Sequence, residues 1–168
     1  MVEEPEGPEA VQRATDACLR LLAVRARSRH ELTLALERKG YAGPVREAVL
    51  ARLGQWGYLD DAKFARERAA SLLGKGKLGP RAVLQRLQAH GLEGAVARQA
   101  LASAKDAVGF DALAAARQVL ERRRLAGRPL DAKEQARAGR LLLSRGFAPD
   151  IVTQLVGEPS LDPSGQDE

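Results

Sequence analysis

The sequence predicts an all-α protein, built as an elongated tandem array of three three-helix repeats. Hydrophobic residues make up 45% of the 168 residues and aromatic residues only 4%. Alanine and leucine, which both favour helix, therefore supply most of the apolar content. Three glycines, Gly40, Gly91 and Gly146, recur in one local pattern at intervals of 51 and 55 residues. Such a regular interval is typical of repeated helical units.

Each of the three glycines predicts the end of a helix. A leucine lies four positions before it and a large apolar residue follows it. In a Schellman cap, glycine adopts the left-handed conformation and the next residue folds back onto that leucine. Gly57 fits the same pattern, with Leu53 before it and Tyr58 after it. The leucines of the three repeats are Leu36, Leu87 and Leu142, and the apolar residues are Tyr41, Leu92 and Phe147.

The other elements follow in chain order. A first helix is expected at about 9–26, and Ser28 with Glu31 forms a capping box that begins the next one. The prolines after Gly43, Gly79 and Ala148 stand where a first helical turn tolerates them. The second and third repeats begin with helices at about 61–74 and 110–126, and flexible joints are expected at 74–79 and 127–130. The predicted organisation is an acidic tail at 1–8, repeats at 9–60, 61–108 and 109–157, and an acidic tail at 158–168.

Two adjacent carboxylates, Asp60 and Asp61, have two interpretations. One of them would accept backbone N–H bonds at the start of the helix that carries Phe64, where a negative charge also suits the helix dipole. The alternative is a catalytic or metal-binding pair. A metal ion needs more ligands than two carboxylates, and no Asp, Glu or His cluster lies nearby in the sequence. The capping interpretation is favoured.

The charge of the chain is unevenly distributed. Residues 10–157 contain all 27 Lys and Arg but only 14 of the 22 Asp and Glu, because both ends are acidic. A folded region this basic is attracted to polyanions or to an acidic protein surface. A well-solvated helical surface with no partner is the simpler alternative.

Few residues suggest chemistry. With one cysteine, Cys18, and two histidines, His30 and His90, in ordinary helical contexts, a zinc site is not expected. No phosphate-binding loop, paired acid and base or activated nucleophile occurs, so neither a cofactor nor an enzymatic activity is expected. Trp56 is expected in the core rather than as a platform for stacking bases. The single cysteine and the lack of a long apolar run indicate a cytoplasmic protein without a membrane segment.

Together, the residues of three segments resemble the bacterial RecX regulatory proteins. The resemblance covers roughly residues 10–156, and its most specific part is the Gly57-Tyr58-Leu59-Asp60-Asp61 segment with Phe64-Ala65. The other matching residues are Arg27-Ser28, Glu31-Leu32 and Lys39-Gly40 in the first repeat, Gly79-Pro80, Leu84, Leu87 and Gly91-Leu92 in the second, and Arg140, Leu142, Arg145-Gly146-Phe147 and Ile151 in the third.

The resemblance implies a function. Members of that family bind the RecA recombinase filament in its helical groove and inhibit its ATPase, its strand exchange and its stimulation of SOS-repressor cleavage. They thereby act in recombination, DNA repair and the SOS response, and they also bind single- or double-stranded DNA weakly. The alternative for this chain is a sequence-nonspecific DNA-binding protein that acts through its basic surface; a monomer is expected in either case.

Basic residues are the candidate contacts to RecA or DNA. If Arg122–Arg124 lie on one helix, three successive side chains spread over roughly 200° of arc and cannot all face one partner. The candidates are Arg25, Arg27, Arg29, Lys75, Lys77, Arg81, Arg117, Arg122, Arg123, Arg124 and Arg128.

Overall fold

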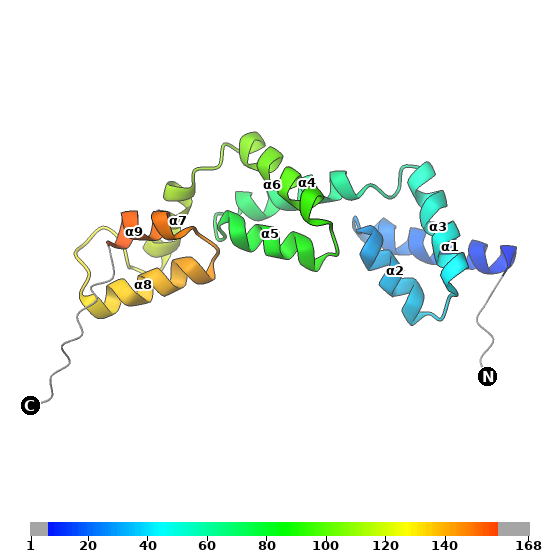
Figure 1. Cartoon of the computed structure of the whole chain (residues 1–168), viewed down its shortest axis with the longest axis horizontal. Coiled ribbons are helices and arrows are strands. Elements are labelled where there is room, and N and C mark those ends of the chain that lie inside the picture. The colour runs from blue at the N-terminus through cyan, green and yellow to red at the C-terminus, as the bar shows by residue number, and fades with distance from the viewer. Residues whose placement is uncertain (1–6, 158–168) are drawn as a thin grey trace, which may run out of the picture. The chain divides into compact units, whose positions relative to one another are not determined.

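The computed structural model describes residues 7–157, which contain nine α-helices and no strand (Figure 1). The predicted all-α class is therefore confirmed for the described residues. Residues 1–6 and 158–168, and with them most of the two expected acidic tails, lie outside the described residues. The helices are α1 (Pro8–Val24), α2 (Arg29–Arg38), α3 (Gly43–Gln55), α4 (Asp61–Gly74), α5 (Pro80–Ala89), α6 (Gly94–Ala107), α7 (Ala112–Arg122), α8 (Ala132–Ser144) and α9 (Pro149–Val156).

The chain divides into two compact units. The first comprises the residues up to Arg68 together with Arg86–Ala100, and the second comprises Ala69–Gln85 together with the residues from Leu101 onward. The division falls inside α4, α5 and α6, so each of these helices contributes one end to each unit.

The first unit has its core among α1, α2 and α3, which lie together in Figure 1. Ala14 and Cys18, one turn apart on α1, face Leu36 of α2 and Val49 and Leu53 of α3 in one buried cluster. Small residues on α1 let it approach α3 closely, and the leucines of the other two helices fill the space. Each fully buried leucine contributes roughly 1.5–3 kcal/mol to the stability of the unit.

The second unit has an equivalent core among α7, α8 and α9. Ala116 and Leu120 of α7 pack with Ala138 and Leu142 of α8 and with Phe147, which is 1% exposed. Phe147 follows Gly146, so the cap that ends α8 also places the largest side chain of this core.

All four predicted glycines are left-handed, and three of the four caps contain the predicted hydrogen bond. Gly40 and Gly146 adopt φ angles of 78° and 83°, in the left-handed region that favours glycine. After Gly40, Gly57 and Gly146, the next residue donates its N–H to the carbonyl of the predicted leucine. The donors and acceptors are Tyr41 and Leu36 at 3.2 Å, Tyr58 and Leu53 at 2.9 Å, and Phe147 and Leu142 at 3.1 Å. Gly91 is also left-handed and its N–H donates to Gln88 O at 2.8 Å, as the Gly40 N–H donates to Glu37 O at 2.9 Å, but among the described residues the Leu92 N–H makes no bond to Leu87 O.

Two helices end earlier than predicted. Helix α1 stops at Val24 instead of residue 26, and α7 spans Ala112–Arg122 instead of 110–126. Arg124 takes the left-handed position, with φ 58°, that glycine takes elsewhere, and the Leu125 N–H donates to Leu120 O at 2.9 Å. Leu125 is 4% exposed, so its burial holds the chain in this reversal. The three arginines at 122–124 are therefore not on one continuous helix.

The prediction that Trp56 lies in the core is wrong. Trp56 is 54% exposed, and its neighbour Tyr58 is 58% exposed. Trp56 is the residue that ends α3, whereas Leu53, three positions earlier, occupies the core position of that turn. The Arg52 guanidinium lies 5.6 Å from the ring centroid of the indole, and the Tyr58 ring packs edge-on, with 6.5 Å between the centroids.

Candidate functional site

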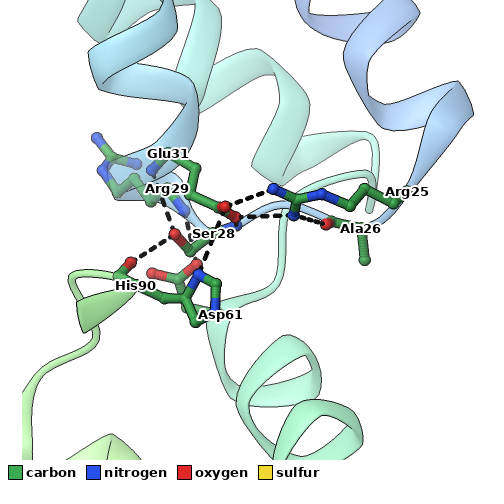
Figure 2. A network of polar contacts seen from close by, with 7 residues as sticks. All are labelled: Arg25, Ala26, Ser28, Arg29, Glu31, Asp61 and His90. Carbon is green, nitrogen blue, oxygen red and sulfur yellow. Dashed lines mark hydrogen bonds and ion pairs between the residues drawn. The ribbon is translucent and has the colours of Figure 1, made fainter. Parts of the chain in front are cut away.

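Ser28 lies at the centre of a polar network that joins the first repeat to the second (Figure 2). Its hydroxyl accepts the Glu31 N–H at 3.2 Å and donates to His90 O at 2.6 Å, while the Glu31 carboxylate accepts the Ser28 N–H at 3.0 Å. The predicted capping box is therefore confirmed. The same hydroxyl also binds the turn that follows α5, a contact that no local sequence pattern indicates.

Arg25 closes this network from the other side. Its guanidinium donates to both Glu31 oxygens, at 2.7 and 3.3 Å, and to Ala26 O at 2.9 Å (Figure 2). Partial burial alone raises the pKa of Glu31, but the hydrogen bonds from Arg25 and from the Ser28 backbone outweigh it and lower that pKa to about 2. Arg25 is thus held by a carboxylate.

The two adjacent aspartates both accept backbone N–H groups at helix N-termini, but of different helices. Asp60 Oδ1 accepts the Lys63 N–H at 2.9 Å, so Asp60 caps α4 as predicted. Asp61 Oδ1 instead accepts the Arg29 N–H at 2.8 Å, at the start of α2 (Figure 2). Within residues 7–157, no group of three or more His, Cys, Asp or Glu side chains is arranged to hold a metal ion.

His90 does not lie in the helical context expected for it, because α5 ends at Ala89. Its Nδ1 lies 3.4 Å from Glu31 Oε1, and its ring packs edge-on against Phe64, with 5.3 Å between centroids. His90 therefore contacts the Ser28 network with both its carbonyl and its ring.

The Arg25 arrangement recurs in the third repeat. Arg128 donates to both Glu134 oxygens, at 2.6 and 2.9 Å, and Glu134 and Asp131 form a capping box at the start of α8. The hydrogen bond from Arg128, followed by that from the Asp131 backbone, lowers the pKa of Glu134 to about 2. Two of the candidate contact residues, Arg25 and Arg128, thus have their charge balanced by a carboxylate within their own repeat.

The second repeat uses a different cap at the equivalent place. Gly79 precedes α5 and has no side chain to accept a bond; its N–H donates to Arg145 O at 2.7 Å, and the Arg81 N–H donates to Gly146 O at 3.1 Å. A Cβ on Gly146 would overlap the backbone of Ala82. The turn after α8 therefore sits on the start of α5, as the turn after α5 sits on the start of α2.

Several candidate residues remain exposed. Lys75, Lys77, Arg81 and Arg117 are exposed, and Arg122 Nη1 lies 3.4 Å from Gly76 O. This contact brings the loop that carries the two lysines next to α7, joining two basic segments that are far apart in sequence. Gly76 also lies close to α7, because Gln118 Oε1 would lie 3.0 Å from a Cβ added at this position.

The basic residues around Ser28 are less accessible. Arg27 is half-buried, and its Nε is enclosed without a hydrogen-bond partner. Arg29 is exposed, with Nη2 at 3.9 Å from Glu47 Oε2.

The second unit also contains a basic hollow that the sequence did not suggest. Arg123 faces Arg137 and Arg140 of α8 around an open hollow of about 370 Å³, which is floored by Leu125 and Leu141. The only local signal was the spacing of Arg137 and Arg140, which puts both on one face of a helix. Arg124, in contrast, is exposed and does not line it.

No helix of the described region is both long enough and apolar enough to cross a membrane.

Comparisons with known proteins agree with this architecture. Three family descriptions match successive parts of the chain: "RecX, first three-helix domain" at residues 14–53, "RecX, second three-helix domain" at 60–101 and "RecX, third three-helix domain" at 111–156. Among solved structures, the fold is similar to that of a crystal structure of regulatory protein RecX, with a TM-score of 0.75 and 18% identity over 87% of this chain and 72% of the other. The structure of RecX from Lactobacillus salivarius gives a TM-score of 0.72 and 19% identity over 91% of this chain and 98% of the other.

Sequence relatives are closer. The chain is 38% identical over 152 residues to a "Regulatory protein RecX" of Halorhodospira halophila, covering 90% of this chain and 89% of the relative. It is 36% identical over 161 residues to the protein of the same name from Mycolicibacterium smegmatis, covering 90% and 85%. The order and extent of these matches, on a structure of nine helices in three successive groups within residues 7–157, show that the chain belongs to the RecX family of regulatory proteins.

Proposed function

We propose that this protein regulates the RecA recombinase. In this proposal it binds the RecA filament in its helical groove and inhibits the filament's ATPase, strand exchange and SOS co-protease activities, without being an enzyme itself. The observation that carries the proposal is the match of all three repeats, in order, to the three domains of the RecX family. We also propose that it acts as a cytoplasmic monomer, with repeats at 9–60, 61–108 and 109–157.

The physical mechanism of the proposal is occupancy by many weak contacts. A filament presents the same surface at every subunit, and three similar repeats in one chain engage it several times at once. Linking weak contacts in this way raises the total affinity without any single strong site. A protein that bridges neighbouring subunits opposes the motions that ATP turnover requires.

The exposed cations supply the attraction. Lys75, Lys77 and Arg122 lie in one region of the second unit, and the side chains of the two lysines are free of ion pairs shorter than 4 Å within the described residues. Cations at such positions are drawn to acidic protein surface or to phosphates. We therefore place the primary contact of the second unit there, and assign Arg25 and Arg128 to holding the helix caps.

The alternative is a protein that binds DNA directly, by charge and without sequence preference. It is supported by the same excess of 27 Lys and Arg over 22 Asp and Glu. The two functions differ in their partner: the alternative retains its affinity for naked DNA at physiological salt and needs no RecA.

Titration of the protein into a RecA ATPase assay on single-stranded DNA tests the proposal. The ATPase rate should fall as the protein approaches the concentration of RecA. The triple variant Arg122→Glu, Arg123→Glu, Arg124→Glu should need a severalfold higher concentration for the same effect, because it reverses the charge at Arg122 in the proposed contact and at the two exposed arginines that follow it.

A second triple variant controls for net charge. Arg66→Glu, Arg86→Glu and Arg98→Glu change the charge equally at exposed positions of the first unit, and should inhibit nearly as well as the unmodified protein. If the unmodified protein leaves both ATPase and strand exchange unchanged at stoichiometric concentration, the proposal is wrong.

A further inference from the structure

The hollow among Arg123, Arg137 and Arg140 is unlike the other basic regions of the second unit. The three arginines come from the end of α7 and from one face of α8, and with Leu125, Leu141 and Ser144 they line a single open hollow of about 370 Å³. A volume of that size is within the range of small-ligand sites.

The positive charge in this hollow is not balanced locally. None of the three arginines has a carboxylate oxygen within 4.0 Å among the described residues, whereas Arg25 and Arg128 each bind a glutamate. The acid on α8, Glu134, feels the charge of Arg137, but its oxygens already accept from Arg128 and the Asp131 N–H. Three like charges held around one space repel each other, and an anion between them would relieve that repulsion.

The fold, not the local sequence, builds this arrangement. The left-handed Arg124 reverses the chain so that Leu125 enters the core, and the reversal leaves Arg123 facing α8. Arg137 and Arg140 are one turn apart, and Leu141 lies beside them on the same helix face. The hollow therefore has a cationic rim and, in Leu125 and Leu141, an apolar floor.

We propose that this hollow binds a phosphodiester of single-stranded nucleic acid, with the neighbouring sugar or base against the two leucines. Each Arg guanidinium offers two parallel N–H donors that match two phosphate oxygens. Three guanidinium groups together offer more donors than one protein carboxylate can accept. The combination of charged rim and apolar floor suits a nucleotide, which has a charged and an apolar part. The inference rests on the proposed function, in which the filament carries single-stranded DNA, and it names one site for that strand.

The test uses the full chain and a fluorescein-labelled oligothymidylate, with binding followed by anisotropy across a series of salt concentrations. The variant Arg137→Ala, Arg140→Ala should lower the affinity at least fivefold at low salt. It should also make the salt dependence shallower, by about 0.7 in the log–log slope for each phosphate that the variant no longer neutralises.

Two variants separate a site from bulk charge. Arg66→Ala, Arg98→Ala removes the same charge from exposed positions elsewhere and should change affinity less than twofold. Arg137→Lys, Arg140→Lys keeps the charge but removes the forked donors, and should bind with intermediate affinity. All four substituted positions are exposed, so the helical circular dichroism and the melting temperature should be unchanged.

Three outcomes overturn the inference: equal losses of affinity in the two alanine variants, full affinity in the lysine variant, or weakened binding to RecA filaments with unchanged binding to the oligonucleotide. The last result would assign the hollow to a protein carboxylate. Because the oligonucleotide assay contains no RecA, its failure is distinct from failure of the proposed function, which the ATPase assay reports with the unmodified protein.

Discussion

At the scale of single residues, Glu31 shows how one side chain combines two tasks. It completes the capping box with Ser28 and it holds Arg25 with two hydrogen bonds. Its pKa in the folded state is about 2, below the ordinary 4.5, so the ionised form stabilises the folded protein. That contribution is complete above about pH 4.5 and disappears as the pH falls toward 2.

Glu31→Gln separates the two tasks, because glutamine still accepts the Ser28 N–H but carries no charge. At pH 7 the melting temperature should fall by about 2–4 °C, the equivalent of roughly 1 kcal/mol for a partly exposed ion pair. Between pH 4.5 and 2 the variant should lose less stability than the unmodified protein, so the melting temperatures of the two proteins should approach each other as the pH falls. Thermal melts by circular dichroism across this range provide the measurement.

The matched variant Glu134→Gln disrupts the same arrangement in the third repeat. Its carboxylate also has a pKa of about 2, but it is more exposed than Glu31, with 30% against 17% of the side chain accessible. The pH effect should therefore be smaller and should weaken further in salt. If the difference in melting temperature between Glu31→Gln and the unmodified protein stays constant down to pH 2, the assignment of a lowered pKa to Glu31 is wrong.

At the scale of elements, the same cap has two different surroundings. Gly40 and Gly146 end their helices with nearly the same φ, 78° and 83°. An added Cβ on Gly40 meets nothing within 4 Å, whereas one on Gly146 would collide with the backbone of Ala82 at the start of α5. The first glycine is needed for its conformation alone, and the second is needed also because another helix rests on it.

Alanine at each position measures the difference. Gly40→Ala should cost about 1–2 kcal/mol, the strain of a left-handed alanine. Gly146→Ala should cost about 1–3 kcal/mol more than Gly40→Ala, because the α5 backbone has to move away. Urea unfolding followed by circular dichroism gives both values, and equal losses of stability would show that the contact between the Gly146 turn and α5 contributes nothing.

Local patterns predicted the elements well but not their long-range contacts. The capping box at Ser28 and the glycine caps follow from spacings of three or four residues, which a single sequence shows directly. Ser28 and His90 are 62 residues apart, and Gly79 meets Arg145 at a similar separation, so no periodicity relates them. Such contacts depend on how one repeat packs on the next.

For the basic residues, too, the sequence predicted the local features but not the long-range arrangement. The sequence identified the excess of positive charge and the density of arginine at 122–124. It could not show that Arg124 reverses the chain, because that position usually carries glycine. Consequently it missed the hollow that joins Arg123 to Arg137 and Arg140. The spacing of arginine, capping residue and glutamate is the same at Arg25 and at Arg128. It would have indicated that both candidate arginines form an ion pair with a glutamate of the same chain.

At the scale of the whole molecule, the two compact units share helices. Because α4, α5 and α6 each belong partly to both units, the loss of structure in one unit frays helices that the other one uses. In repeat proteins, stability depends on such nearest-neighbour terms as well as on each repeat itself. We therefore expect damage in the second unit to weaken the first.

Cys18 reports on the first unit alone. It is the single cysteine of the chain, it is fully buried on α1, and burial raises its pKa to about 11. Since the thiolate is the reactive form, an aromatic disulfide reagent should modify it only after the first unit opens. In Gly146→Ala, altered only in the second unit, the urea concentration at which Cys18 becomes reactive should fall below that of the unmodified protein. If Gly146→Ala lowers the circular dichroism midpoint while Cys18 becomes reactive at an unchanged urea concentration, the shared helices do not couple the units.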